Sequence, residues 1–221
     1  MCIRDSYLGL ELQSLALYVL ASFKRNDQLS SESGLKYFVL SALSSGLLLY
    51  GCSLIYGFSG STNFDQISNN ISEVQYGLTL GIVFILVGLA FKISAVPFHM
   101  WAPDVYQVSP TSVTIFFAIL PKIAALSVFI RFLYVPFINL IDQWQTIIIF
   151  VSIASMVFGA VAAIGQKNLK RLMAYSSISH MGFALAGLAV GTNEGIQSSL
   201  IYISIYLLMN LAFFSCLFML K

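Results

Sequence analysis

Long apolar runs separated by short polar stretches make up most of the chain. A bilayer core about 30 Å thick requires about 20 apolar residues per helix, and only helices or closed barrels satisfy their backbone groups there. The runs are too long and too continuous for the strands of a barrel. We therefore predict an all-α, polytopic transmembrane bundle of about seven helices, at residues 8–23, 37–58, 78–96 with a continuation to 106, 111–135, 146–165, 172–190 and 198–220.

Composition supports a membrane protein and excludes several other classes. Of the 221 residues, 58% are hydrophobic and only 9% are charged, which does not describe a soluble surface. The net charge of +2 is too small for a nucleic-acid surface, and no phosphate loop, zinc spacing or dinucleotide fingerprint occurs. Cys2, Cys52 and Cys216 are odd in number and far apart, so we interpret them as small hydrophobic residues rather than as a disulfide or metal site.

Basic residues fall on one side of the membrane if the predicted helices alternate in direction. These residues are Lys24, Arg25 and Lys36 after the first run, Lys167, Lys170 and Arg171 after the fifth, and Lys221 after the seventh. Short loops rich in lysine and arginine stay on the inner side of a membrane. We therefore predict an outer N-terminus and an inner C-terminus. This topology fully explains Lys170 and Arg171, to which we assign no chemistry.

Besides Arg131, near the end of the fourth predicted span, three charged residues lie inside the spans: Glu11 in the first, Lys92 in the third and Lys122 in the fourth. A lysine at membrane depth costs about 2.5–3.5 kcal/mol on insertion scales. Because these residues are present despite that cost, we infer that their side chains line an internal hydrated path. Two alternatives stay open, because these groups could instead snorkel to the headgroups or form a static structural pair.

Proline lies close to both lysines. Pro97 follows Lys92 by five residues, and Pro121 directly precedes Lys122. Proline removes a backbone hydrogen bond, and transporters build ion sites from helices that are broken at membrane depth. We predict proline-broken helices near Lys92 and Lys122, with a simple proline kink as the alternative.

The chemistry predicted for the buried charges is proton transfer. Burial favours the neutral form of an amine, whereas a neighbouring carboxylate favours its charged form. A Glu11–Lys92 pair that opens and closes would therefore switch the lysine between holding and releasing a proton. His99 lies seven positions after Lys92 and would share its helix face if the helix ran straight. A histidine there could carry the proton onward.

Three further polar residues have more than one interpretation. His99 and His180, the latter about nine residues into the sixth span, are either proton relays or hydrogen-bonded structural residues. For Asp104, in the sequence APDVY, the first interpretation is that its side chain caps a helix or loop. The residues alone do not choose between these roles.

Four stretches carry a resemblance to a known family. They are LGLELQSLALYVLASFKR, ESGLKYFVLSALSSGLLLYGCSLIYG, FKISAVPFHMWAPDVYQVSPTSVTIFFAILPKIAAL and NLKRLMAYSSISHMGF. Together they resemble the subunit N family of NADH-quinone oxidoreductase, called subunit 2 in mitochondria, which are antiporter-like membrane subunits of respiratory complex I. The resemblance extends from residue 8 to residue 221. Related antiporters share a Lys-Pro-His-Trp-Pro-Asp pattern, and VPFHMWAPDVY is similar to its N-type form.

The resemblance implies a proton relay and a set of supporting polar residues. Glu11 matches the membrane glutamate of the family, Lys92 the lysine of the broken helix that pairs with it, and Lys122 the central lysine of the next helix. The supporting residues are Lys36, His99 and Asp104, which fall on polar positions of the family, and His180. The family couples the reduction of quinone by NADH, carried out elsewhere in the complex, to proton translocation along such a polar axis.

On this resemblance the chain is a non-redox subunit of NADH:quinone oxidoreductase that is not catalytic alone. It would bind no cofactor and no metal, because NADH and quinone are used by the whole complex. Its partners would be the lipid bilayer and other complex I membrane subunits, including neighbouring antiporter-like subunits, and not nucleic acid. Its location would be an energy-transducing membrane, either the bacterial plasma membrane or the mitochondrial inner membrane.

The chain departs from the family in its extent. The family subunit has about fourteen helices, whereas this chain resembles a middle block of seven and ends before a further buried lysine of the family. We expect residues 1–7 to be a flank outside the family sequence, with a non-native origin left open, and residues 8–221 to be a partial antiporter-like transmembrane domain of a fragment. Two other functions stay open: an Mrp-type cation/proton antiporter subunit, and a structural membrane protein whose buried charges pair statically.

Overall fold

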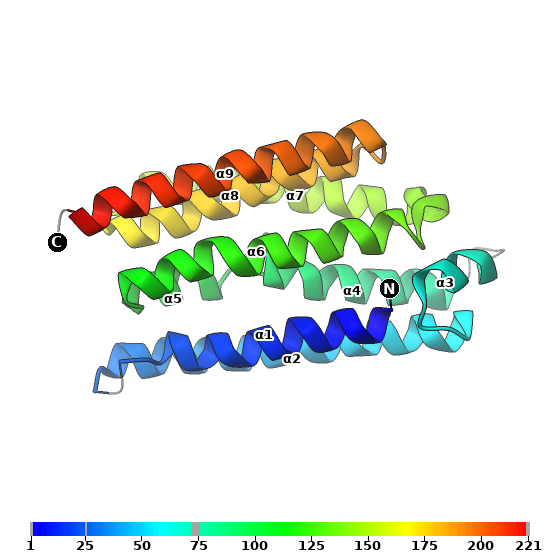
Figure 1. Cartoon of the computed structure of the whole chain (residues 1–221), viewed down its shortest axis with the longest axis horizontal. Coiled ribbons are helices and arrows are strands. Elements are labelled where there is room, and N and C mark those ends of the chain that lie inside the picture. The colour runs from blue at the N-terminus through cyan, green and yellow to red at the C-terminus, as the bar shows by residue number, and fades with distance from the viewer. Residues whose placement is uncertain (1, 25, 72–75, 220–221) are drawn as a thin grey trace.

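Seven long helices carry the apolar runs of the sequence, and all of them lie along the long axis of the molecule (Figure 1). The computed structural model describes residues 2–24, 26–71 and 76–219. Within these ranges the long helices are α1 (Ile3–Ala21), α2 (Gln28–Ser59), α4 (Tyr76–Lys92), α6 (Thr111–Tyr134), α7 (Ile141–Ile164), α8 (Leu169–Ala189) and α9 (Asn193–Met219). The short elements are α3 (Phe64–Asn70), α5 (Trp101–Val108) and a 3-10 turn, η1 (Ile138–Leu140). The predicted all-α bundle is confirmed.

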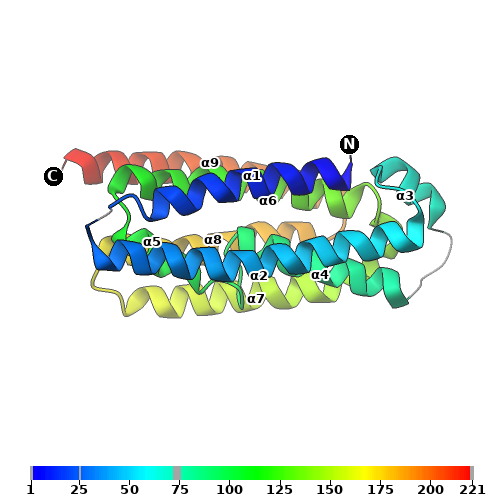
Figure 2. The same ribbon diagram turned by 90° about the horizontal axis from the view of Figure 1, so that it is seen from below.

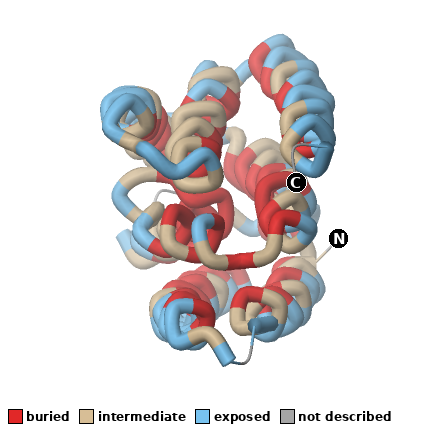
Figure 3. Tube along the Cα trace, turned by 90° about the vertical axis from the view of Figure 1, so that its left-hand side faces the viewer, coloured by how far each residue is buried: buried red, intermediate tan, exposed pale blue. Residues whose placement is uncertain are grey.

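The bundle has three tiers. Helices α1 and α2 form an antiparallel pair on one side, α4, α5 and α6 lie in the middle, and α7, α8 and α9 form the other side (Figure 1). Helix α4 packs on α2 and α6, α5 packs on α2 and α8, and α6 also packs on α1 and α9. Viewed along the bundle, buried positions lie between the helices and exposed positions face outward (Figure 3). Many outward side chains are large and apolar, as a lipid-facing surface requires.

Length and composition allow five of the described helices, α2, α6, α7, α8 and α9, to cross a membrane, and the chain is a multi-pass membrane protein. Helix α4 is a shorter apolar helix of 17 residues. The 19-residue helix α1 carries Arg4, Asp5 and Glu11 along with its apolar residues.

Several helices begin earlier than the hydrophobic runs predicted. Helix α1 begins at Ile3 instead of residue 8, and α2 begins at Gln28 instead of residue 37. The reason at α2 is a cap: the Asp27 side chain accepts a hydrogen bond from the backbone N–H of Leu29 at 3.0 Å. Polar residues then continue the helix beyond its apolar part, so hydropathy alone placed the boundary too late. That residues 1–7 are a flank outside the family sequence stays a prediction.

Helix α4 ends at Lys92, which confirms the predicted break near that lysine but places it earlier than residue 96. Ser94 has a φ of 57°, in the left-handed region. The N–H of Ala95 donates to the Ala90 carbonyl at 2.9 Å, and the N–H of Ser94 donates to the Phe91 carbonyl at 3.0 Å. This is the Schellman arrangement that ends helices, with a serine where glycine is usual. The helix therefore stops by its own C-terminal cap, before Pro97 is reached.

Helix α6, in contrast, continues through Pro121, so the predicted break near Lys122 is wrong. Proline at position 121 leaves the Phe117 carbonyl without its helical N–H donor. The hydroxyl of Tyr106, from α5, donates to this carbonyl at 3.1 Å. Because a neighbouring side chain satisfies the freed group, α6 keeps its helical path past the proline.

The two basic connections lie at the same end of the bundle. Residues 22–24 and 26–27, between α1 and α2, and residues 165–168, between α7 and α8, are both on the left in Figures 1 and 2. We call this the basic end, after Lys24, Lys167, Lys170 and Arg171. Arg25 and Lys221, which the topology prediction also used, lie outside the described residues. The orientation of this end toward the inner side of a membrane stays a prediction.

Candidate functional site

Lys92 sits in a polar cluster between α1, α2 and α4. Its Nζ lies 3.0 Å from Oε1 of Glu11, and it donates hydrogen bonds to the hydroxyl oxygens of Ser14 at 2.7 Å and Ser41 at 3.3 Å. The Lys92 side chain is 6% exposed and that of Glu11 19%. The hydrogen bonds from Nζ to the two hydroxyls help to offset the cost of burying the ammonium group. We call Lys92, Glu11, Ser14 and Ser41 the Lys92 cluster.

Local helix geometry assembles this cluster. Glu11 and Ser14 are three residues apart, so both project from the same face of α1. Lys92 is the last residue of α4, where the carbonyl end of the helix favours a positive charge. Ser41 belongs to a buried stripe of α2 that also contains Tyr37, Ser44 and Leu48. Three helix faces thus meet around one ammonium group.

Lys122 occupies a second polar cluster, and its partners are different. The lysine is fully buried in α6, and its Nζ donates to the Ser177 hydroxyl of α8 at 2.6 Å. The Tyr106 ring lies 5.6 Å from Nζ, and the Ser177 hydroxyl donates in turn to the Ala174 carbonyl at 2.7 Å. Among the described residues, no carboxylate lies within ion-pair distance of Lys122. A hydroxyl and an aromatic face therefore take the place of a counter-ion.

Tyrosines of α9 connect this second cluster to His180. The hydroxyl of the buried Tyr206 donates to the Ala118 carbonyl, one turn before Lys122, at 3.3 Å. The His180 ring lies 5.3 Å from the Tyr206 ring, and its Nδ1 lies 2.7 Å from the Tyr202 hydroxyl. His180 is therefore held on the α9 side of α8 by a hydrogen bond. We call Lys122, Ser177, Tyr106 and Tyr206 the Lys122 cluster.

His99 does not join either cluster. The expectation that it shares a helix face with Lys92 is wrong, because α4 ends at Lys92 and His99 lies in the irregular segment before α5. Its ring packs on Phe158 of α7 at 4.5 Å. Its buried Nδ1 has no hydrogen-bond partner among the described residues.

Asp104 lies in an ionic cluster at the basic end. Its two oxygens are 3.2 Å from Nη1 of Arg171 and 3.6 Å from Nζ of Lys36, which also pairs with Glu32 at 2.8 Å. Asp104 is the fourth residue of α5, whose N-cap is Met100, so the cap interpretation is wrong. Instead it joins α5 to α2 and α8. These side chains are 34–56% exposed, so each ion pair contributes little to stability.

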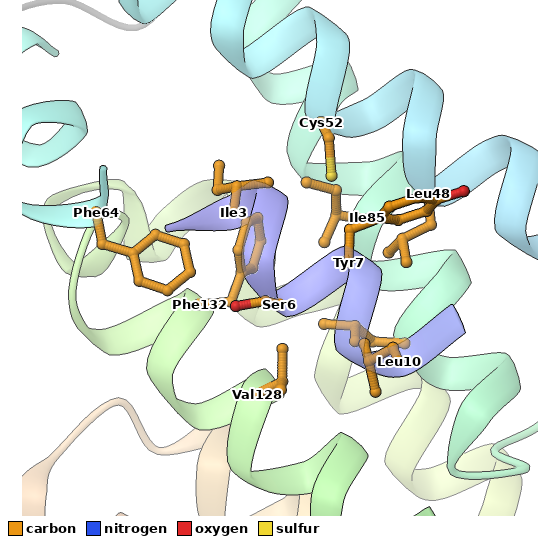
Figure 4. Close-up of a pocket in the computed structure, with 11 residues that line it drawn as sticks. Ile3, Ser6, Tyr7, Leu10, Leu48, Cys52, Phe64, Ile85, Val128 and Phe132 are labelled. Atoms are coloured by element: carbon orange, nitrogen blue, oxygen red, sulfur yellow. The ribbon is translucent and has the colours of Figure 1, made fainter. Parts of the chain in front are cut away.

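Toward the N-terminal end of α1 from Glu11, a small, mostly apolar cavity of about 20 Å³ lies between α1, α2, α3, α4 and α6 (Figure 4). Its apolar lining residues include Ile3, Leu10 and Phe132, and Ser6, Tyr7 and Cys52 also line it. A cavity of this size has room for about one water molecule.

Sequence reasoning missed the hydroxyl partners of both lysines. Ser14, Ser41 and Ser177 are ordinary residues of membrane helices, and nothing in the linear pattern pairs them with a lysine. The spacing of Glu11 and Ser14 was the one available signal. Arg171, explained by topology alone, also turns out to pair with Asp104.

The described residues contain neither a group of side chains for a metal ion nor a disulfide. Among the described residues, no three His, Cys, Asp or Glu side chains are grouped to hold a metal ion. Cys2, Cys52 and Cys216 are all unpaired thiols.

The chain is similar to known proteins over nearly its whole length. A family model described as NADH:quinone oxidoreductase/Mrp antiporter, transmembrane, matches residues 3–221. NADH-quinone oxidoreductase subunit N of Pelagibacter ubique is 79% identical over 215 residues, which are 97% of this chain and 46% of that protein. The chain thus spans less than half the length of the curated relatives it matches.

Solved structures give the same fold. A chain of respiratory complex I from Thermus thermophilus with bound aureothin superposes with a TM-score of 0.81 at 36% identity, covering 96% of this chain and 45% of that one. A chain of the Mrp complex from Dietzia superposes with a TM-score of 0.88 at 23% identity, covering 96% of this chain and 40% of that one. At that identity the second likeness shows the fold alone.

Proposed function

Because the chain belongs to the NADH:quinone oxidoreductase/Mrp antiporter transmembrane family, we propose that it is a proton-translocating membrane subunit of respiratory complex I. Identity of 58–79% to proteins named subunit N supports complex I over an Mrp complex. In this function the chain carries no redox centre and is not catalytic alone. NADH and quinone react elsewhere in the whole complex, and their energy drives protons through the membrane subunits.

One observation carries the proposal: two lysines are buried in neighbouring helices among groups suited to either protonation state. Lys92 has a carboxylate 3.0 Å away, and Lys122 has the Ser177 hydroxyl 2.6 Å away. A hydroxyl oxygen accepts from an ammonium group and donates to a neutral amine, so it stabilises both forms. Separation of a carboxylate from a buried ammonium group promotes proton release, and its return promotes proton uptake.

The position of Lys92 suits such a switch. It is the last residue of α4, followed by the irregular segment 93–100. A small change in this segment would alter the Glu11–Lys92 distance without breaking a helix. Lys122, within the continuous α6, would then receive or pass on the proton from a fixed position.

The partners and the location follow from the same proposal. The partners are other complex I membrane subunits, including neighbouring antiporter-like subunits, together with lipid. The membrane is an energy-transducing one, the bacterial plasma membrane or the mitochondrial inner membrane, and the bacterial sources of the curated relatives favour the former.

Replacement of each lysine in the assembled complex tests the function. We expect Lys92→Ala or Lys122→Ala to lower NADH-driven proton uptake by inverted membrane vesicles while the complex still assembles on a native gel. Lys167→Ala, at an exposed lysine of the basic end, is the matched control and should pump normally. Normal pumping by both buried-lysine variants would overturn the proposal. Loss of assembly to the same degree as loss of pumping would indicate a static structural pair instead.

An Mrp-type cation/proton antiporter subunit is the second candidate, since it has the same fold and family model. If the chain had this second function, membranes containing it should show sodium-dependent proton exchange that does not require NADH. Neighbouring genes separate the two, because complex I genes should flank one and cation-antiporter genes the other.

A further inference from the structure

The Lys92 cluster continues toward the basic end through one more hydroxyl. The Tyr18 hydroxyl, from α1, donates to the Ser41 hydroxyl oxygen at 2.6 Å, and Ser41 in turn contacts Nζ of Lys92 at 3.3 Å. Tyr18 is half-buried, whereas Ser41 and Lys92 are buried. A continuous series of polar atoms thus runs from a partly exposed side chain to the buried ammonium group.

Tyr18 also lines an open cleft of about 510 Å³ between α1 and α2. The other lining residues are Val19, Ser22, Ser31, Gly34, Leu35 and Phe38. Ser22 directly follows α1 and Ser31 lies in the first turn of α2, so the cleft opens beside the connection at the basic end. Tyr18 is four residues from Ser22, or about 6 Å along a helix. The Tyr18 side chain therefore extends from this cleft to the buried Ser41 hydroxyl.

The space toward the other end of α1 is much smaller. Toward the α3 end, α1 borders the cavity of about 20 Å³, whose lining is mostly apolar but also includes Ser6, Tyr7 and Cys52 (Figure 4). The cleft of about 510 Å³ at the basic end has room for many water molecules, whereas this cavity has room for about one. This difference in volume favours the basic end as the side from which protons reach Lys92.

We propose that Tyr18 and Ser41 form a hydroxyl relay that carries protons between water in the α1–α2 cleft and Lys92. This inference rests on the proposed function, in which Lys92 loads and releases protons. It adds two relay residues and an access route from the basic end.

The relay is balanced in atoms and charge. A hydronium ion in the cleft gives a proton to Oη of Tyr18 as the Tyr18 hydroxyl hydrogen passes to Oγ of Ser41. The Ser41 hydrogen passes at the same time to the unprotonated amine of Lys92. Each hydroxyl oxygen breaks one O–H bond and forms one, so only Lys92 gains a proton and only the hydronium ion loses one. Rotation of both hydroxyls restores the starting arrangement.

Tyr18→Phe in the assembled complex is the first test, because it removes only the hydroxyl. The ring makes edge-to-face contacts with Tyr37 at 5.0 Å and Phe38 at 5.4 Å, and phenylalanine keeps both. We expect NADH-driven proton uptake by inverted vesicles to fall about a hundredfold, the lower end of the effect of removing a group that transfers protons. Tyr50→Phe, at an exposed tyrosine of α2 with a similar ring contact to Phe84, should pump normally.

A double variant separates a relay from a structural effect. Ser41→Ala should lower pumping as much as Tyr18→Phe, and the two together should lower it no further, because either change breaks the same series. Added imidazole, a small proton carrier, should partly restore pumping in both single variants and should not help Lys92→Ala. Additive losses without imidazole rescue would overturn the relay.

Cysteine labelling tests the water in the cleft. In a complex whose three natural cysteines in this chain are replaced by serine, Val19→Cys lines the cleft, and Leu15→Cys lies one turn away on α1 at a position that is also exposed but outside the cleft. We expect a charged, membrane-impermeant thiol reagent added at the basic end to label the first and spare the second. Equal protection of both cysteines would overturn the access route.

These experiments keep the two proposals distinguishable. Low pumping by Lys92→Ala with normal pumping by Tyr18→Phe and Ser41→Ala would overturn the relay and leave the proposed function standing. Normal pumping by Lys92→Ala would overturn both.

Discussion

Lys92 and Lys122 are buried lysines in adjacent helices, and the protein compensates their charges by different means. Lys92 lies at the end of α4 and has a carboxylate and two serine hydroxyls as partners. Lys122 lies inside the continuous α6 and has one serine hydroxyl and the face of a tyrosine ring. The difference shows that a membrane bundle can stabilise a buried lysine in two ways. One is a carboxylate that can move away from the ammonium group, and the other is a set of neutral groups in fixed positions.

The stability of the bundle should depend most on the counter-ion. Removal of one partner from a buried pair leaves an uncompensated charge and costs about 3–5 kcal/mol. We expect Glu11→Ala to lower the free energy of unfolding by about 3 kcal/mol, the lower end of this range, because Glu11 stays partly exposed. The measurement is the temperature at which the purified complex loses this subunit.

The double variant Glu11→Ala with Lys92→Met is the control for that prediction. Replacement of a whole buried pair by apolar side chains is often neutral, so the double variant should be more stable than Glu11→Ala alone. A double variant as unstable as the single one would mean that Glu11 acts on stability through contacts other than Lys92.

The hydroxyl partner of Lys122 should have a smaller effect. A hydrogen bond to a charged group contributes about 1.5–3 kcal/mol, so we expect Ser177→Ala to cost about 2 kcal/mol in the same measurement. Ser204→Ala is the matched control, because this exposed serine of α9 bonds only its own helix at 2.8 Å. If Ser177→Ala were as mild as Ser204→Ala, Lys122 would not depend on this hydroxyl.

The ionic cluster at the basic end should matter least. Arg171 is 34% exposed and pairs with Asp104, which is 36% exposed. Such pairs are screened by water, so Arg171→Gln should cost about 1 kcal/mol or less. The same thermal measurement, repeated at high salt, should show no further loss in the variant. A loss as large as that of Glu11→Ala would contradict the ranking of buried above exposed pairs.

Much of the fold was predictable from the apolar runs. Seven long helices were expected and are present in the described residues, because helices are the structures that satisfy the backbone of such runs in lipid. The boundaries were less predictable. The Asp27 cap extends α2 into polar sequence, and the Schellman arrangement at Ser94 ends α4 before the proline.

The candidate site was predictable only in its charged members. Glu11, Lys92 and Lys122 are conspicuous in apolar sequence, since charge at membrane depth is costly. A serine or tyrosine side chain at membrane depth costs much less free energy than a charged one. The sequence therefore contains no comparable signal for Ser14, Ser41, Ser177 and Tyr18. The behaviour of α6 at Pro121 was also hidden, because it depends on a hydroxyl from α5.

The sequence by itself determined the class of protein, the number of long helices and the identity of the buried charges. Each of these follows from local hydropathy and from the free-energy cost of placing a charged side chain in lipid. Only the tertiary structure decided which side chains form hydrogen bonds or ion pairs with those charged groups. Tyr18 and Ser41 are 23 residues apart and Lys122 and Ser177 are 55 apart, and each pair is brought together by helix packing. Hydrogen bonds over such separations depend on how helices rotate against one another, which the linear pattern of one helix does not contain.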